Sequence, residues 1–137
     1  MNRNDRGQAL VELALVLPLI LLVSVGLIDA TRAVWQYNEL ALAAREGTRY
    51  AIVHGAGSVA PTGPSANDTA VRAEVLRFTI GMSNVSVVSS WPNGTNNRGD
   101  AVRVDVIAPF APVLSQYLLN GAFNVTLRGG SELVIQR

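Results

Sequence analysis

The chain has 137 residues, of which 49% are hydrophobic and 15% charged, with eleven basic side chains, ten acidic ones and no cysteine. About a hundred residues beyond the first thirty suffice for one small domain with a single core. A formal charge of +1 without a basic patch argues against a nucleic-acid partner, and the lack of cysteine excludes disulfides, thiolate catalysis and cysteine metal sites.

The N-terminal segment is an apolar run that follows two arginines. Arg3 and Arg6 precede it, and residues 9–28 carry one charge, that of Glu12. Twenty helical residues span about 30 Å, the thickness of the hydrocarbon core of a bilayer. We therefore predict one membrane-spanning segment at about 9–28, with residues 1–7 as a cytoplasmic leader by the positive-inside rule and the rest outside. A carboxylate in such a run is costly and indicates a use.

A secretory signal peptide is the second interpretation of this run. The arginine-flanked start fits it, but the apolar run exceeds the usual length of about 7–15 residues for such a peptide. Asp29 and Arg32 crowd the place where cleavage would occur, and Glu12 falls where the peptide should be purely apolar. A retained membrane helix is therefore the preferred interpretation.

The helical pattern continues beyond the apolar run. No proline occurs between Ala30 and Val53, and apolar or small residues recur there at three- and four-residue steps. These residues are Val34, Tyr37, Ala41, Ala44 and Thr48. We predict one long helix over residues 8–53, apolar in its first half and amphipathic in its second. Pro18 removes one backbone hydrogen bond, so a kink is expected there, and Gly47 weakens the helix by about 1 kcal/mol relative to alanine.

Two stretches of this helix resemble a known family. Residues 6–18 read RGQALVELALVLP, and residues 43–51 read AAREGTRYA. Both are similar to the recurring blocks of TadE-like proteins, the pseudopilins of tight-adherence (Tad) pili. The end of the chain, with a valine-rich strand, Ala108-Pro109-Phe110 and a final strand, resembles that family more loosely.

The resemblance implies a build similar to type IV pilins, with a short basic leader, a membrane helix and an external domain. A prepilin peptidase is then expected to cut between Gly7 and Gln8, which places Glu12 at the fifth position of the mature chain. In type IV pilins a glutamate there faces the N-terminal amine of a neighbouring subunit and sets the axial register. A carboxylate in a low-dielectric bundle requires such a cation. The chain departs from the family at Gln8, where an aromatic residue is frequent, and at Leu13, where tyrosine is.

The function implied by the resemblance is that of a pseudopilin or pilin subunit, a structural component of a Tad pilus in adhesion or biofilm formation. The expected location is the bacterial cytoplasmic membrane, with later incorporation into an extracellular pilus. The expected partners are membrane lipid, other pilin or pseudopilin subunits and the prepilin peptidase. The alternatives are a membrane-anchored accessory protein that never polymerises, a cleaved and secreted binding domain, and, as the weakest, an enzyme.

Residues 54–137 are expected to form an external α+β domain that is pilin-like, with one or two further helices on a mostly antiparallel sheet of about three or four strands. Its first part, residues 54–64, is rich in glycine, alanine, serine and proline and is predicted as a loop. N-cap candidates at residues 67–69 begin a second helix over about Asp68–Ile80, with Gly81 as its C-cap.

Two strands follow, at Val85–Ser90 and Ala101–Ala108, joined by a loop at residues 91–99. The second strand alternates valines with Arg103 and Asp105, so one face is expected to be buried, and Asp105 is expected to pair across the sheet. Trp91 is expected to close an end of the sheet.

The C-terminal part holds a choice between two topologies. Pro109 and Pro112 are expected to end the second strand, and Val113–Leu119 is predicted as a short helix. Gly129-Gly130 would suit a tight hairpin turn. The alternation of apolar and polar residues instead favours one strand over Phe123–Gln136.

No catalytic residue, metal site, cofactor or small-molecule substrate is predicted, and we do not expect an enzyme. His54, the only histidine in the sequence, lies beside glycines and is interpreted as a surface residue. Four Asn-x-Ser/Thr sequons occur, at Asn67, Asn84, Asn93 and Asn124. Asn93 is the best candidate for glycosylation because it lies in a loop, although chance occurrence in a domain rich in these residues is the preferred interpretation.

Overall fold

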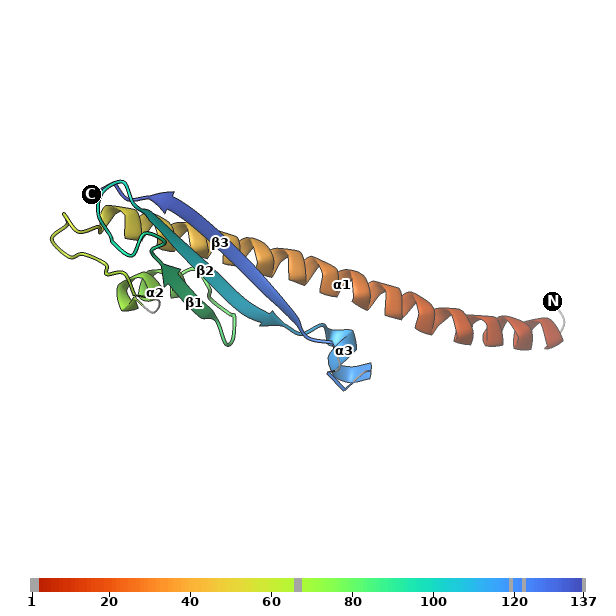
Figure 1. Cartoon of the computed structure of the whole chain (residues 1–137). Helices are drawn as coiled ribbons and strands as arrows, with labels where there is room; N and C mark the ends of the chain where they lie inside the picture. Colours follow the sequence, from red (N-terminus) through yellow and green to blue (C-terminus); the bar gives the residue numbers. More distant parts are fainter. Residues whose placement is uncertain (1–2, 66–67, 119, 122, 137) are drawn as a thin grey trace. The chain divides into compact units, whose positions relative to one another are not determined.

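The computed structural model describes residues 3–65, 68–118, 120–121 and 123–136. Three helices and three strands follow one another in the order α1, α2, β1, β2, α3 and β3 (Figure 1). Their bounds are Arg3–Val53, Thr69–Leu76, Ser86–Ser90, Ala101–Phe110, Val113–Leu118 and Val125–Val134. A long N-terminal helix followed by short helices and an antiparallel sheet confirms the predicted α+β class.

The chain divides into two compact units. The first, here called the helical unit, consists of residues 1–33 and 111–124, and the second, the sheet unit, consists of residues 34–110 and 125–137. The long helix α1 contributes to both, and the connection between β2 and β3 belongs to the helical unit.

Helix α1 begins at Arg3, five residues before the predicted start, and ends at Val53 as predicted. Pro18 lies inside it, and the helix is assigned on both sides of this residue; the expected kink stays a prediction. Within the described residues, α1 is the one helix long and apolar enough to cross a membrane. Its most apolar window has a mean hydropathy of 2.7 and is not buried by any other part of the chain.

The buried stripe of α1 in the sheet unit differs from the predicted one. Ala44 and Thr48 are buried as expected, but Val34 is 61% exposed and Tyr37 is 50% exposed. The helix instead turns a row of mostly small residues inward, made up of Leu40, Ala43, Ala44, Gly47, Thr48 and Ala51. Small side chains allow close approach: a Cβ built at Gly47 would lie 2.4 Å from Val75 Cγ2 of α2. Gly47 weakens α1 locally, but its lack of a side chain allows Val75 of α2 to pack closely against α1.

Helix α2 begins where the sequence predicted and ends earlier. Asp68 is its N-cap, and the carboxylate Oδ1 accepts the backbone N–H groups of Ala70 and Val71 at 3.0 Å each; Asn67 lies outside the described residues. The helix ends at Leu76 with Arg77 as its C-cap, so the predictions of Ile80 as the end and Gly81 as the cap are wrong. After Leu76 the backbone hydrogen bonds shorten to three-residue spacing, as from Phe78 N to Val75 O at 3.0 Å, which ends regular α-helical winding.

The sheet is an antiparallel meander in the order β1-β2-β3, so β1 and β3 are its edge strands. Strand β2 runs through Pro109, which pairs with Thr126, so the prediction that this proline ends the strand is wrong. A proline is tolerated there because the pairing with β1 has already ended, with Ser86 opposite Ile107. No neighbouring strand on that side requires the missing N–H.

Strand β3 is continuous through both glycines, as the alternation predicted, and the hairpin alternative is wrong. Gly129 lies opposite Val106 and Gly130 lies opposite Asp105. A Cβ built at Gly129 would lie 2.4 Å from the backbone carbonyl carbon of Leu40. The glycine is thus explained by the close approach of α1 to the strand rather than by a turn.

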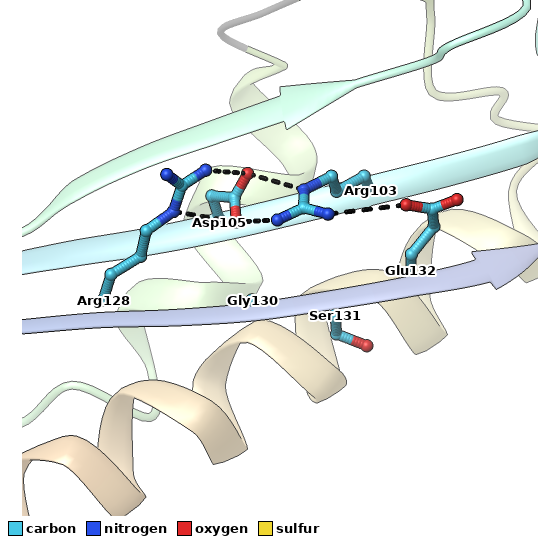
Figure 2. A pocket seen from close by; sticks show the side chains of 6 residues that line it. All are labelled: Arg103, Asp105, Arg128, Gly130, Ser131 and Glu132. Atoms are coloured by element: carbon cyan, nitrogen blue, oxygen red, sulfur yellow. Dashed lines mark hydrogen bonds and ion pairs between the residues drawn. The ribbon is translucent and has the colours of Figure 1, made fainter.

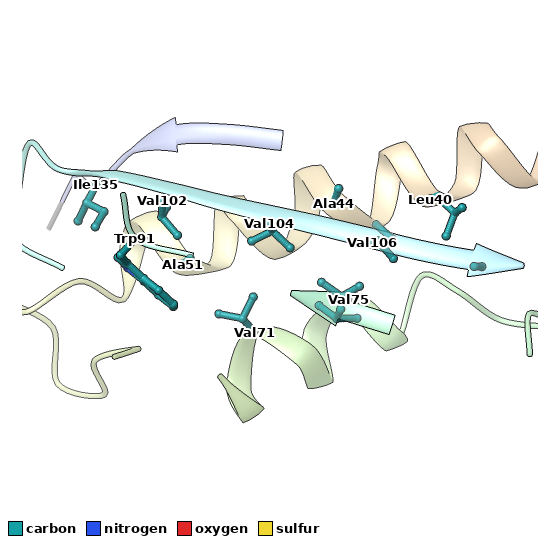
Figure 3. Packing of buried hydrophobic residues seen from close by; sticks show 13 residues of the cluster. Leu40, Ala44, Ala51, Val71, Val75, Trp91, Val102, Val104, Val106 and Ile135 are labelled. Atoms are coloured by element: carbon teal, nitrogen blue, oxygen red, sulfur yellow. The ribbon is translucent and has the colours of Figure 1, made fainter. Parts of the chain in front are cut away.

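The core of the sheet unit lies between α1, α2 and the inner face of the sheet. Figure 3 shows Val102, Val104 and Val106 of β2 among buried residues from both helices. Trp91 is 7% exposed and belongs to the same cluster, which confirms its predicted place. His54 is half-buried rather than on the surface, because its ring stacks on Tyr50 with the ring centroids 4.0 Å apart.

Candidate assembly and membrane surface

The first half of α1 presents a largely apolar surface. Most large apolar side chains from Leu10 to Ile28 are exposed; Leu15 is 73% exposed and Leu19 is 63% exposed. Each exposed apolar Å² costs about 25 cal/mol in water, and a contiguous patch of this kind marks a membrane or protein contact. This surface therefore belongs in lipid or against other apolar helices.

Glu12 interrupts this apolar surface. Its side chain is exposed and lines a shallow cavity of about 270 Å³ together with Ala9, Leu13 and Val16. Among the described side chains, none forms a hydrogen bond or ion pair with it. A carboxylate in surroundings of this polarity is stabilised only by a cation or by hydrogen-bond donors that come from elsewhere. The geometry leaves the place for such a group open.

The predicted processing site lies in the first turns of α1. Gly7 and Gln8 are both helical and exposed, and a Cβ built at Gly7 would meet no atom within 4 Å. Residues 1–2 of the predicted leader lie outside the described residues. Cleavage between Gly7 and Gln8 stays a prediction.

Asp29, at the end of the apolar run, is 6% exposed. Its Oδ2 accepts the backbone N–H of Leu114 in the first turn of α3 at 3.2 Å, and its Oδ1 accepts Arg32 Nη1 at 3.0 Å. The carboxylate thus satisfies a backbone donor that the start of a helix leaves without an intrahelical partner. It ties α3 to α1 within the helical unit. Sequence reasoning missed this role, and the available signal was an acidic residue directly behind the apolar run.

An apolar groove runs between α1 and α3 in the helical unit. It has a volume of about 420 Å³ and is lined by Pro18, Leu21, Leu22, Val25, Val113, Leu114 and Tyr117. All of its α1 residues belong to the predicted membrane-spanning segment at 9–28. Pro18, predicted as a kink, thus also contributes a wall of this groove.

The outer face of the sheet carries a network of charges centred on Asp105 (Figure 2). Arg103 donates to Asp105 from Nε at 2.9 Å and from Nη2 at 3.1 Å. Arg128 of β3 lies with Nη2 2.7 Å from Oδ2 and Nε 3.2 Å from Oδ1 of the same carboxylate. The predicted pairing of Asp105 across the sheet is confirmed.

The network is held by geometry on both strands. Glu132, directly opposite Arg103, places Oε2 3.6 Å from Arg103 Nη1. A Cβ built at Gly130 would lie 2.6 Å from Asp105 Oδ1, so the glycine makes room for the carboxylate. Hydrogen bonds from Arg103, and then from Arg128, lower the pKa of Asp105 below its ordinary value of 3.8, against the opposing effect of burial.

Asn93, the predicted glycosylation candidate, is exposed in the loop after β1. Its Nδ2 donates to Asp100 Oδ1 at 2.9 Å, and the hydroxyl of Thr95 donates to the other carboxylate oxygen. These two hydrogen bonds are the main cause that lowers the pKa of Asp100 below its ordinary value. The amide that would carry a glycan is therefore part of a loop-closing network, and glycosylation stays a prediction.

Over the described part of the chain, no three His, Cys, Asp or Glu side chains are grouped so that they could hold a metal ion. The features that distinguish this molecule are therefore an apolar run at residues 9–28 of α1 that carries one carboxylate, and the α3 segment attached to that helix. Both involve the stretch that contains the RGQALVELALVLP motif.

Residues 7–49 match the family model described as TadE-like protein. This segment is similar to TadE-like proteins. The match confirms the resemblance seen in the two stretches of the long helix, and it includes Gly7, Gln8, Glu12 and Pro18. No curated protein and no solved structure matches the chain. The TadE-like segment suggests a protein associated with a Tad pilus, and it lies wholly within α1.

Proposed function

We propose that the chain is a pilin-like structural subunit of a Tad pilus, acting in adhesion or biofilm formation. In this proposal α1 crosses the bacterial cytoplasmic membrane once, with the N-terminus inside, and later packs against the helices of sister subunits. The observation that carries the proposal is Glu12, the one carboxylate in the apolar run at residues 9–28, which is exposed and lies inside the segment that matches the TadE-like family.

The transfer from membrane to filament is physically feasible. Lipid tails and a helix bundle are both apolar, so moving the exposed leucines of α1 between them costs little, and van der Waals packing can favour the bundle. Glu12 differs from these leucines because its charge is unfavourable in either place unless a cation lies beside it. Its partner in the assembled state is therefore proposed to come from another subunit.

The N-terminal amine of a neighbouring subunit is the proposed partner. Cleavage between Gly7 and Gln8 by a prepilin peptidase would create this amine four residues before Glu12, at the edge of the same apolar surface. Mass spectrometry of protein purified from membranes with an active peptidase tests the step. A chain that begins at Gln8 supports it, and an intact leader in such cells contradicts it.

The decisive experiment removes the carboxylate while leaving the apolar surface intact. We expect Glu12→Ala to insert into the membrane as the unaltered chain does and to be depleted roughly tenfold or more from sheared pili, because a lost buried ion pair costs several kcal/mol. Glu39→Ala, the same change later in α1, is the matched control and should be incorporated normally. Normal incorporation of Glu12→Ala would contradict the register role.

Single cysteines distinguish a filament subunit from a non-polymerising accessory protein. Because the chain has no cysteine, Leu15→Cys or Leu19→Cys introduces the one thiol that can form a disulfide between copies. Cross-linked dimers in sheared pili support helix-to-helix packing of subunits. Absence of the chain from sheared pili, with normal amounts in the membrane, would instead favour the accessory role.

A further inference from the structure

We propose that α3 and Phe123, in the connection between β2 and β3, bind the lipid surface beside α1, with Tyr117 and Phe123 at the boundary between hydrocarbon and headgroups. The occupant of the groove between α1 and α3 is then lipid acyl chain. This inference rests on the proposed function in one respect, that α1 crosses a membrane.

The attachment of α3 to α1 fixes its depth in the bilayer. Leu114 donates its backbone N–H to Asp29 at 3.2 Å, and a Cβ built at Gly26 would lie 3.7 Å from Leu114 Cδ1. The apolar run ends at Ile28, and each helical residue rises about 1.5 Å. The first turn of α3 is therefore held within a few ångströms of the boundary between hydrocarbon and headgroups.

The composition of the segment suits that boundary. No charged side chain lies between Asp105 and Arg128 in the sequence. Tyr117 is 82% exposed and Phe123 is 63% exposed, an arrangement that is unfavourable in water. Aromatic side chains are enriched at membrane interfaces, where the ring meets acyl chains and a phenol hydroxyl meets headgroups.

Three hydrogen bonds pair polar groups within this part of the chain around Ser115. This serine is 3% exposed. Its hydroxyl donates to the Phe123 carbonyl at 3.0 Å and accepts the Phe123 N–H at 2.9 Å. The Ser115 carbonyl accepts the N–H of Gly121 at 2.7 Å. Backbone groups paired in this way can approach an apolar phase without a large desolvation penalty. The rings of Tyr117 and Phe123 are exposed and take no part in these hydrogen bonds.

The groove favours lipid over a protein partner as its occupant. Its wall on α1 is formed by Pro18, Leu21, Leu22 and Val25, all inside the segment that would lie in hydrocarbon. Acyl chains are the abundant apolar material at that depth before any filament forms. Tyr117 of α3 also lines the groove.

The test places an environment-sensitive NBD fluorophore on single cysteines of the full chain reconstituted in phosphatidylcholine vesicles. The labelled variants are Tyr117→Cys and Phe123→Cys, with Arg98→Cys as an exposed control in the loop before β2 and Leu19→Cys as a control in the apolar run. Nitroxide lipids that quench near the headgroups or near the bilayer centre report depth, and aqueous iodide reports exposure to water.

We expect the labels at positions 117 and 123 to be quenched most strongly by headgroup nitroxides and at least twofold less by iodide than the label at position 98. Iodide quenching at both positions equal to that at position 98, with position 19 quenched near the bilayer centre, would overturn the inference and leave the membrane helix intact. Absence of lipid quenching at position 19 would instead overturn the membrane-spanning part of the proposed function.

Discussion

Gly129 of β3 packs directly on the backbone of Leu40 in α1, where a Cβ would lie 2.4 Å from the carbonyl carbon and 2.5 Å from the carbonyl oxygen of Leu40. Leu40 is fully buried, so the strand and the helix approach as closely as two backbones can at this point. The contact sets which face of α1 meets the sheet.

Gly129→Ala is therefore expected to destabilise the sheet unit strongly. The obstructing atoms are backbone and cannot rotate away, so we expect a loss of about 3 kcal/mol, the upper end of the range for overpacking. Urea unfolding of the detergent-solubilised chain, followed by the tryptophan fluorescence of Trp35 and the buried Trp91, measures it. Gly63→Ala, where a Cβ meets no atom within 4 Å, is the control and should change stability by less than about 0.5 kcal/mol. Equal effects of the two changes would contradict the assignment.

Gly47→Ala tests the contact between α1 and α2. Alanine favours the helix by about 1 kcal/mol, but its Cβ would lie 2.4 Å from Val75 Cγ2, and overpacking costs about 1–3 kcal/mol. We expect net destabilisation of about 1 kcal/mol. In the double variant with Val75→Ala the clash of about 2 kcal/mol disappears, so the stability loss should be about 2 kcal/mol smaller than the sum of the two single losses. Val71→Ala is the matched control, since Val71 Cγ1 lies at an ordinary 3.7 Å and should couple more weakly.

Stability of the sheet unit is expected to fall in acid because of Asp105. Its pKa is lower in the folded chain than the ordinary value of 3.8, so the unfolded state binds protons first as the pH falls. The free energy of unfolding should be constant above about pH 5 and decrease below about pH 4. Asp105→Asn should be less stable at neutral pH and show a shallower acid slope. Some slope should remain, because the pKa of Asp100 is also lowered. An unchanged slope in urea titrations between pH 3 and pH 5 would contradict the role of Asp105.

Asp29→Ala is expected to loosen the first turn of α3. Loss of a capping carboxylate costs about 1 kcal/mol, which corresponds to roughly fivefold faster exchange of the protected amide. Hydrogen exchange with mass spectrometry on peptides that contain Leu114 measures the effect in detergent. Asparagine caps helices about as well as aspartate, so Asp29→Asn should remain close to the unaltered chain. Unchanged exchange in Asp29→Ala would show that the bond from Leu114 does not hold the turn.

The sequence predicted those parts of the fold that local chemistry determines. Asp68 was a candidate cap because a carboxylate before a helical pattern suits unpaired N–H groups. The continuity of β3 followed from the parity of its side chains, because a turn at Gly129-Gly130 would have mixed apolar and polar residues on both faces. The charge on Glu12 and the arginines that precede the apolar run could likewise be identified from the sequence alone.

Other features depend on partners distant in sequence. Ala44 and Thr48 belong both to the predicted buried stripe and to the observed one. Residue spacing alone cannot decide whether Tyr37 or Leu40 is buried with them. The approach of Gly129 decides it, because only the face with Leu40 meets the strand. Asp29 and Leu114 are separated by 85 positions, so no local pattern identifies their bond. From the sequence alone Pro109 predicts the end of a strand. It does not end β2 because β1 pairs only as far as Ile107, and the sequence does not show that limit.

Because β3 is an edge strand of the sheet, it bears on whether neighbouring copies of the protein could pair through their sheets. An edge strand of ten residues such as β3 can offer backbone amides and carbonyls as a template on which another chain adds a strand. Arg128 and Glu132 place charges along that border, and the paired glycines between them lower its tendency to stay extended and rigid. Pairing of sheet edges between crowded copies is thus disfavoured, which is consistent with the proposal that copies meet through the apolar surface of α1.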